Sequence, residues 1–343
     1  MTTVVYSWLK SISYKTVILS LLFFSIGVLT GKVLPSPEAT QDVTTKHMGR
    51  IKYTNPLVDH PGINESNKEY LTKKKQIEKT IQEYLKTKSA QTISVYYQDL
   101  ETNRWFSINE TERYTPASLM KVTLLLAYLK LSEVRPALLQ ETIVNEGQYT
   151  DLANVPPAQR LAVNKTYTVQ ELLFNMIVHS NNEAQHLLSD YLDARVTPET
   201  RSRLVYETMT LIPASYEISD QYNLTVVDYA GIFRILYNAT YLSESLSEQA
   251  LALLAESSFD SGIVNGLPEN VITANKFGFK ENKQSPDSMQ FHDCGIVYAE
   301  PTPYILCVMT KTDDPLKAQK IVSEISNQVY NLVLSPEQKE TSF

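Results

Sequence analysis

Strand-like patterns lie at both ends of the main body of this chain, and a long helical interval separates them. Residues 92–108 are rich in β-branched and aromatic residues around one short turn. Residues 272–312 contain three further segments of this kind, whereas 118–256 is mostly helical in its apolar spacing. Because antiparallel strands need only short connections, this order predicts an α+β fold. We expect a five-stranded antiparallel sheet built from both ends, beside an all-α insertion.

Four segments carry the apolar spacing of helices. Residues 67–87 predict an amphipathic helix before the first strand, and residues 314–334 predict a closing helix that begins behind Asp314-Pro315. Between the two strand regions, a strongly apolar helix starts at Ser118 and runs to about residue 131. Another is expected from Thr168, a suitable N-cap, up to Ser180. These helices would cover the sheet and build the insertion.

The N-terminus contains a strongly apolar segment. Residues 16–31 carry no formal charge and are flanked by Lys15 and Lys32, whose long side chains can reach a membrane interface. We expect residues 1–34 to be a cytoplasmic tip and a single transmembrane signal-anchor, with the body exported from the cytoplasm. A cleaved signal peptide is the alternative, although residues 35–39 offer only a poor cleavage site.

The remaining boundaries follow from composition. Residues 35–66 contain four prolines among polar residues and predict a flexible linker. Residues 67–336 would form one catalytic domain, and residues 337–343 a short tail. The organisation predicted is therefore a domain tethered to the outer side of a cell membrane.

Charge and cysteine content exclude several classes of function. The net charge is −7 and no basic patch of the kind that binds nucleic acid is visible. Five histidines and two cysteines show no metal-ligand spacing, so we expect no metal and no other cofactor. Cys294 and Cys307 flank a predicted hairpin turn; they either form a disulfide or are two small buried side chains. We expect a monomer.

The chemistry begins with Ser118 and Lys121, which form an S-x-x-K step at the start of an apolar helix. Residues three apart share one face of a helix, so the lysine amine can approach the serine hydroxyl. A serine is a weak nucleophile until a base takes its proton, and a desolvated amine can be that base. Because the step alone is common in proteins, it indicates this chemistry only when other catalytic motifs accompany it.

Two further motifs come later in the chain. Ser180-Asn181-Asn182 begins 62 residues after Ser118, and Lys276-Phe277-Gly278 begins 96 residues after Ser180. The set resembles the S-x-x-K, S-D-N and K-T-G signature of class A β-lactamases and penicillin-binding proteins. The resemblance covers about residues 68–334, and that family has the α+β arrangement expected above.

The resemblance implies a role for each motif residue. Ser118 would be the nucleophile, Lys121 the general base for acylation, and Ser180 a relay that protonates the leaving nitrogen. Lys276 would lower the basicity of Lys121 and attract a substrate carboxylate.

Other residues would contact the substrate. Asn182 would fix the lysine amine and hydrogen-bond the substrate amide, and Phe277, Gly278 and Phe279 would line the binding edge. The oxyanion hole would use the backbone N–H groups of Ser118 and Phe279. Asn181 replaces the usual aspartate, a position mostly engaged in local structure.

Three positions depart from the family pattern. Phe277 replaces a hydroxyl residue that meets the substrate carboxylate, which removes a hydrogen bond worth about 1.5 to 3 kcal/mol. Cys294 stands where an arginine often helps to hold the same carboxylate. Glu217 is the best match for the carboxylate that activates the deacylating water, but Gln221 takes the place of the asparagine expected four residues later.

These residues predict a membrane-anchored serine hydrolase that acts through a Ser118 acyl-enzyme on a small β-lactam or a cell-wall-like amide. A DD-peptidase acting on peptidoglycan-derived peptides is one alternative, because the deacylation segment is a poor match. A non-catalytic envelope-binding domain is another, because Phe277 and the missing arginine weaken carboxylate recognition.

Overall fold

A computed structural model describes residues 68–152, 154–197, 199, 200, 204, 223–281 and 289–334. The predicted signal-anchor (1–34), the linker (35–66) and the tail (337–343) lie outside these residues. Among the residues described, no helix has the length and apolar character needed to cross a membrane.

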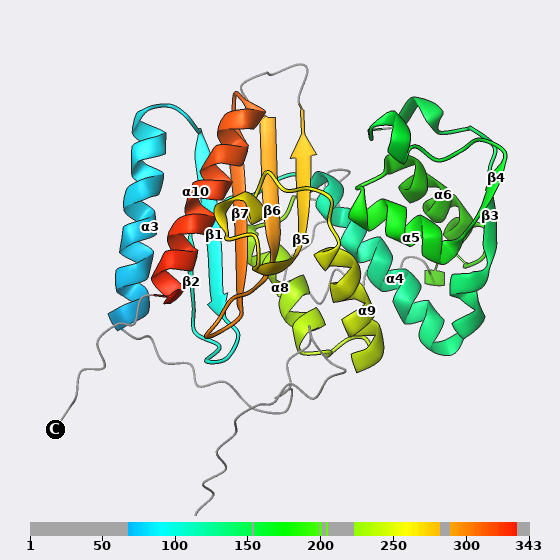
Figure 1. Ribbon diagram of the computed structural model, residues 1–343, viewed down its shortest axis with the longest axis horizontal. Coiled ribbons are helices and arrows are strands. Elements are labelled where there is room, and N and C mark those ends of the chain that lie inside the picture. The colour runs from blue at the N-terminus through cyan, green and yellow to red at the C-terminus, as the bar shows by residue number, and fades with distance from the viewer. Residues whose placement is uncertain are drawn as a thin grey trace, which may run out of the picture. The chain divides into compact units, whose positions relative to one another are not determined.

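One five-stranded antiparallel sheet forms the centre of the fold, as the sequence predicts. Its order is β2-β1-β7-β6-β5, so the first strand of the body pairs with the last one (Figure 1). The strands are β1 (Thr92–Asp99), β2 (Trp105–Ile108), β5 (Ile272–Lys280), β6 (Met289–Tyr298) and β7 (Tyr304–Thr312).

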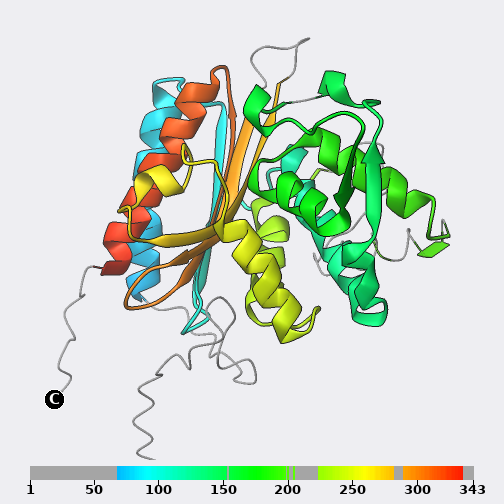
Figure 2. The same cartoon turned by 45° about the vertical axis from the view of Figure 1, so that its right-hand side comes forward.

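Helices cover both faces of this sheet, which explains why its central strands are apolar on both sides. Helices α3 (Lys68–Lys86) and α10 (Pro315–Leu334) lie together on one face, and α8 (Val226–Tyr237) and α9 (Glu244–Ala255) lie toward the other (Figure 2). Along β1, Val95 and Tyr97 pack into the core under α3 and α10, whereas Tyr96 packs into the opposite core. Successive side chains of β1 therefore point to opposite faces of the sheet, and both faces are buried.

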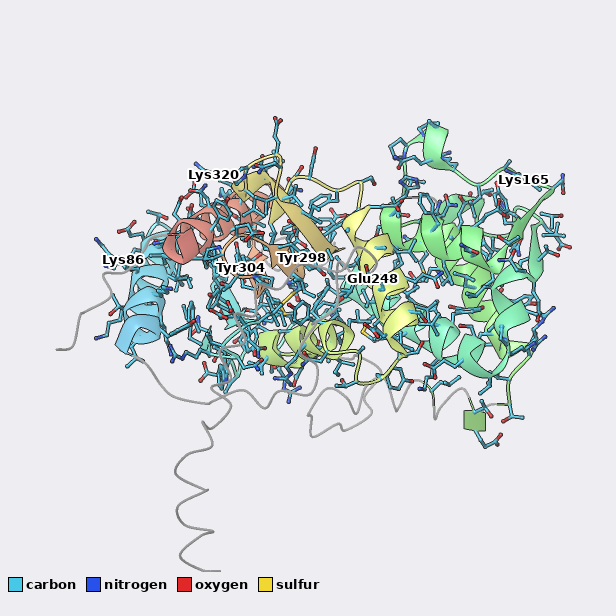
Figure 3. The ribbon with its side chains drawn as sticks, turned by 60° about the horizontal axis from the view of Figure 1, so that its bottom comes forward. Lys86, Lys165, Glu248, Tyr298, Tyr304 and Lys320 are labelled. Atoms are coloured by element: carbon cyan, nitrogen blue, oxygen red, sulfur yellow. A yellow bond between two sulfur atoms is a disulfide. The ribbon has the colours of Figure 1, made fainter. Side chains whose placement is uncertain are left out.

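The polarity of the two outer helices matches this arrangement. Lys86 on α3 and Lys320 on α10 are exposed, while Tyr304 of β7 is fully buried between the helices and the sheet (Figure 3). The apolar stripes that predicted these helices are thus the surfaces that cover the sheet.

The insertion is built around α4 (Lys121–Val134), α5 (Val169–Val178) and α6 (Asn182–Asp193). Thr168 is the N-cap of α5, as predicted, and its hydroxyl accepts a hydrogen bond from the backbone N–H of Glu171. Ser118 differs from the prediction: it lies in a 3-10 turn, Ala117–Met120, and the α-helix begins only at Lys121.

The prediction that the insertion is all-α is wrong. Strands β3 (Thr142–Asn145) and β4 (Lys165–Thr168) pair as a small antiparallel sheet within it. Both have four residues, too few for alternation to be distinctive, and the long connection between them carries no hairpin signal. Their β-branched and aromatic residues, such as Ile143, Val144 and Tyr167, are the local cause of the strands.

Cys294 of β6 and Cys307 of β7 are direct partners on neighbouring strands and form a disulfide. This decides between the two alternatives that the sequence left open. Both cysteines are fully buried.

Replacing both cysteines by alanine is expected to lower the free energy of unfolding by about 2 to 3 kcal/mol, because the cross-link restricts the unfolded chain. Denaturant titration of wild type and variant, each with and without reductant, measures the difference. The reductant should leave the variant unchanged. Two alkylatable thiols in the unreduced, unfolded wild type would contradict the disulfide.

Candidate active site

The turn that carries Ser118 is tightly constrained. Ala117, directly before it, has a φ of 50°, a left-handed conformation that costs a non-glycine residue about 1 to 2 kcal/mol. Such a conformation persists only where neighbouring contacts hold it. One of these contacts comes from α8, where the buried Tyr229 hydroxyl donates to the carbonyl oxygen of Leu119 at 2.8 Å.

Gly278 brings strand β5 against the same turn. A Cβ atom at this position would lie 2.6 Å from the carbonyl oxygen of Pro116. The glycine of the third motif is therefore needed for close backbone approach, and it places β5 beside the segment that carries Ser118.

Lys121 is buried, with 1% of its surface exposed. Its Nζ donates to the backbone oxygen of Ser180, to Ser180 Oγ at 3.2 Å and to Asn182 Oδ1 at 2.7 Å. Burial lowers the pKa of this amine to about 7. In the part of the chain described, no hydrogen bond joins it to Ser118, because its three donors are already used. Loss of one proton would free a lone pair for the Ser118 hydroxyl.

Ser180 lies between two buried amines. Its Oγ accepts from Lys121 Nζ and, at 2.9 Å, from Lys276 Nζ, and its own φ of 53° turns the chain sharply between α5 and α6. Lys276 is fully buried. Burial and the neighbouring Lys121 hold the pKa of Lys276 well below its usual range, while Asp293 opposes this shift. The three motifs therefore meet at one hydroxyl.

Asn181, the middle residue of the second motif, has a structural role. Asn181 is the N-cap of α6, and its side-chain oxygen accepts from the N–H of Ala184 at 3.0 Å. An uncharged amide can do this as well as a carboxylate, so the departure from aspartate leaves the helix start intact.

Asn154 was not predicted from the sequence. Its Nδ2 donates to the Ser180 carbonyl at 3.0 Å, and its Oδ1 accepts from the N–H of Asn182 at 2.9 Å. It thereby ties the turn of the second motif to the loop before β4. A single polar residue in a long loop gives no signal by which this could have been found.

Phe277 stacks on Phe259, with ring centroids 3.8 Å apart, and Lys276 Nζ lies 4.2 Å from the centre of its ring. The residue that replaces the hydroxyl of the third motif thus contacts the buried cation through its aromatic face. Phe279, two residues on, is 40% exposed and free to meet a ligand.

Asp293 is a second residue that sequence reasoning missed. It is fully buried on β6, and its carboxylate accepts from Asn275 Nδ2 at 2.9 Å and from the N–H of Ile263 at 2.8 Å. Burial raises its pKa. Its charge favours the protonated form of Lys276, but burial and Lys121 outweigh this effect on the pKa of the lysine.

Of the other two departures from the family pattern, the structure describes Cys294 but not Glu217. Cys294 lies opposite Lys276 in the sheet, and its disulfide leaves this site without the cation that an arginine would bring. Glu217 and Gln221 lie outside the described residues. Within those residues, no cluster of three or more His, Cys, Asp or Glu is arranged to hold a metal ion.

This arrangement is suited to acyl transfer. It offers a serine on a constrained turn, a buried amine whose pKa lies near neutrality, and a hydroxyl that accepts hydrogen bonds from two amines and can relay a proton.

Comparisons with known proteins agree with the fold. The model of the β-lactamase enzyme family matches residues 75–333. Similar solved structures include the TLA-3 extended-spectrum β-lactamase, with 17% identity, a TM-score of 0.65 and coverage of 76% of this chain and 99% of that one. A class A β-lactamase representative from Bacteroides cellulosilyticus has 20% identity, a TM-score of 0.64 and coverage of 76% and 98%.

A third similar structure is that of PBP-A, with 18% identity, a TM-score of 0.62 and coverage of 80% of this chain and 98% of that one. A variant of PBP-A has been solved as an acyl-enzyme complex with penicillin G, at 17% identity, a TM-score of 0.63 and coverage of 80% and 99%. No curated protein matched the chain.

Proposed function

Because the chain belongs to the β-lactamase enzyme family and is a serine hydrolase that acts on amide bonds, we propose that it acylates Ser118 with a β-lactam or a cell-wall-like peptide and then releases the product by hydrolysis. The observation that carries this proposal is the position of the Ser180 hydroxyl between the two buried amines of Lys121 and Lys276.

The acylation step follows from the proton donors and acceptors at the site. Neutral Lys121 takes the proton of Ser118 as the serine oxygen forms a bond to the substrate carbonyl carbon. The N–H groups of Ser118 and Phe279 stabilise the negative oxygen that develops. As the C–N bond breaks, the proton passes from Lys121 through the Ser180 hydroxyl to the leaving nitrogen, and the ester on Ser118 remains.

Lys276 positions the relay hydroxyl in this step. Its amine donates to Ser180 Oγ at 2.9 Å and so orients the relay hydroxyl. Repulsion between the two amines acts on Lys276, whose pKa is lowered by burial and by Lys121, whereas burial lowers the pKa of Lys121. Water then hydrolyses the ester, and Glu217 is our candidate for activating that water.

We also propose that the catalytic domain lies outside the cell membrane, held by an N-terminal span in residues 1–34. The apolar segment 16–31 and its flanking lysines support this location. The disulfide between Cys294 and Cys307 supports it independently, since disulfides persist in oxidising compartments.

A peptidase acting on peptidoglycan-derived peptides is the second candidate. The observation in its favour is Gln221, which replaces the asparagine expected beside Glu217 in a rapid deacylation site. The likeness to PBP-A is compatible with either candidate.

The test is a time course of intact mass for the full chain in detergent with benzylpenicillin. A transient gain of one penicillin, with accumulating hydrolysed drug, is the result expected for a β-lactamase cycle. An adduct that persists for hours without turnover selects the peptidase. Heat-unfolded protein is the control for non-specific reaction with lysines, and a folded protein that forms no adduct contradicts acylation by β-lactams.

A further inference from the structure

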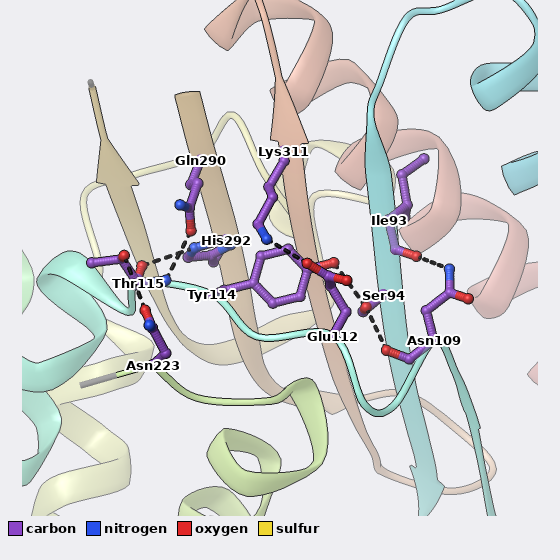
Figure 4. A network of polar contacts seen from close by, with 10 residues as sticks. All are labelled: Ile93, Ser94, Asn109, Glu112, Tyr114, Thr115, Asn223, Gln290, His292 and Lys311. Atoms are coloured by element: carbon purple, nitrogen blue, oxygen red, sulfur yellow. Dashed lines mark hydrogen bonds and ion pairs between the residues drawn. The ribbon is translucent and has the colours of Figure 1, made fainter. Parts of the chain in front are cut away.

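Two side chains of β6 hold the segment that leads into the Ser118 turn, one through the backbone N–H of Thr115 and the other through its carbonyl oxygen. The backbone N–H of Thr115 donates to Gln290 Oε1 at 2.8 Å. Its carbonyl oxygen accepts from His292 Nε2 at 3.1 Å, so this nitrogen carries a proton (Figure 4). We propose that Gln290 and His292 are positioning residues that fix the Ser118 turn against β5 and so set the spacing of the two oxyanion-hole N–H groups.

The pairing of β6 with β5 places these two contacts beside the strand that carries Phe279. Gln290 pairs with Lys280 and His292 pairs with Gly278, so the two side chains flank the position of Phe279 on the neighbouring strand. They lie two residues apart on β6 and therefore share one face of the sheet. The contacts to Thr115 thus connect the segment before Ser118, through β6, to the strand that carries Phe279.

The imidazole is held in a defined state by its surroundings. His292 is fully buried, the ring of Tyr114 packs edge-on against it with centroids 5.2 Å apart, and burial lowers its pKa to about 4. Lys311, which pairs with Glu112 and lies over the Tyr114 ring, also lowers this pKa. The neutral ring is therefore the form that donates to Thr115 around neutral pH.

The turn has other supports, and these allow the contact to be removed without loss of the fold. Tyr114 is held separately by an antiparallel bridge to Leu224, with backbone hydrogen bonds of 2.9 and 2.8 Å. The hydroxyl of Thr115 donates to Asn223 Oδ1 at 3.3 Å. What Gln290 and His292 add is the direct connection to β6.

This inference rests on the proposed acylation of Ser118, and its test uses three variants. Gln290→Met and His292→Leu remove the acceptor and the donor, and His292→Gln keeps an N–H donor of similar reach. Because misplaced oxyanion donors act on the transition state, Gln290→Met and His292→Leu are expected to lower the benzylpenicillin acylation rate constant at saturation about 10- to 100-fold. The half-saturating concentration should change little, and His292→Gln should recover most of the rate.

Ser94→Ala is the matched control. Ser94 hydrogen-bonds Tyr114 in the same network at 2.8 Å, and its other hydrogen bond goes to the carbonyl of Asn109 and not to Thr115. It is expected to lower Tm without slowing acylation. If Gln290→Met and His292→Leu lower Tm as Ser94→Ala does and acylate at the wild-type rate, the two residues only stabilise the fold and the proposal is wrong.

A second measurement does not depend on any substrate. Hydrogen exchange of the peptide spanning residues 115–120 should become about tenfold faster in Gln290→Met, while peptides from α10 exchange as in wild type. If wild type is not acylated by benzylpenicillin, the proposed function fails, and exchange still decides whether the contact holds the turn. Unchanged exchange at 115–120 in a folded variant would overturn the inference.

Discussion

Replacement of Ser118 by alanine is expected to abolish the covalent adduct with benzylpenicillin and to lower any hydrolysis by about four to six orders of magnitude. The size follows from the role proposed for the hydroxyl: without it no ester forms, and the residual rate comes from binding and the oxyanion hole alone. The removed atom lies on a half-buried side chain that makes no hydrogen bond among the described residues, so Tm should change little.

Ser132→Ala is the control for this variant. Ser132 lies on the helix after the Ser118 turn, and its buried hydroxyl donates to the carbonyl of Leu129 at 2.7 Å. The Ser132→Ala substitution also removes a serine hydroxyl oxygen from this region, but this hydroxyl is not part of the site. Intact-mass measurements should find full labelling of Ser132→Ala and none of Ser118→Ala. Equal labelling of both would mean that another residue is acylated.

Lys121→Met is expected to slow acylation by about 10²- to 10⁴-fold, the usual contribution of a general base. In wild type the rate should rise with pH around a midpoint near 7, because burial lowers the pKa of Lys121 to about 7 and only its neutral form accepts the serine proton. This inflection should disappear in the variant. Stopped-flow or quenched acylation with benzylpenicillin from about pH 5 to 9 measures both effects.

The pH dependence of folding stability provides a separate test of the lowered pKa of Lys121. Because the pKa of Lys121 is lower in the folded chain, the unfolded chain holds more protons between the ordinary lysine range and pH 7. Stability should therefore fall as the pH is lowered through this interval, and it should fall less in Lys121→Met.

Lys130→Met, on the same helix, is the control for both measurements. Lys130 forms a partly exposed ion pair with Glu133 at 2.7 Å, away from the site. A rate or an inflection lost in both variants would contradict the assignment of the base.

Residue type and apolar spacing were sufficient to predict the main sheet and its covering helices. The central strands are buried on both faces and form short apolar runs rich in β-branched and aromatic residues, whereas the covering helices have one apolar stripe. The four-residue strands around Ile143 and Tyr167 were missed because two alternations cannot be told from chance. Their pairing depends on tertiary contacts within the insertion.

The motif residues could be located because each brings a reactive group at a recognisable spacing. The residues that hold them could not. They act through only one or two hydrogen bonds each to segments remote in sequence, and nothing in their immediate neighbourhood distinguishes them from ordinary loop or strand residues. These residues are Asn154, Asp293, Gln290 and His292. The departure at Phe277 was visible, but its stacking on Phe259 depends on a loop that only the fold brings near.

The pairing of β1 with β7 also bears on when the protein becomes active during its synthesis. Tyr96 lies opposite Cys307, so the hairpin of β1 and β2 emerges from the ribosome long before the strand that completes its hydrogen bonds. Until then this edge is unpaired and the apolar stripe of α3 has no α10 to contact. Such long-range pairing folds late. A nascent chain that carries Ser118 but lacks β7 has no strand to join the first hairpin to β6, and we expect no reaction of Ser118 before that strand is present.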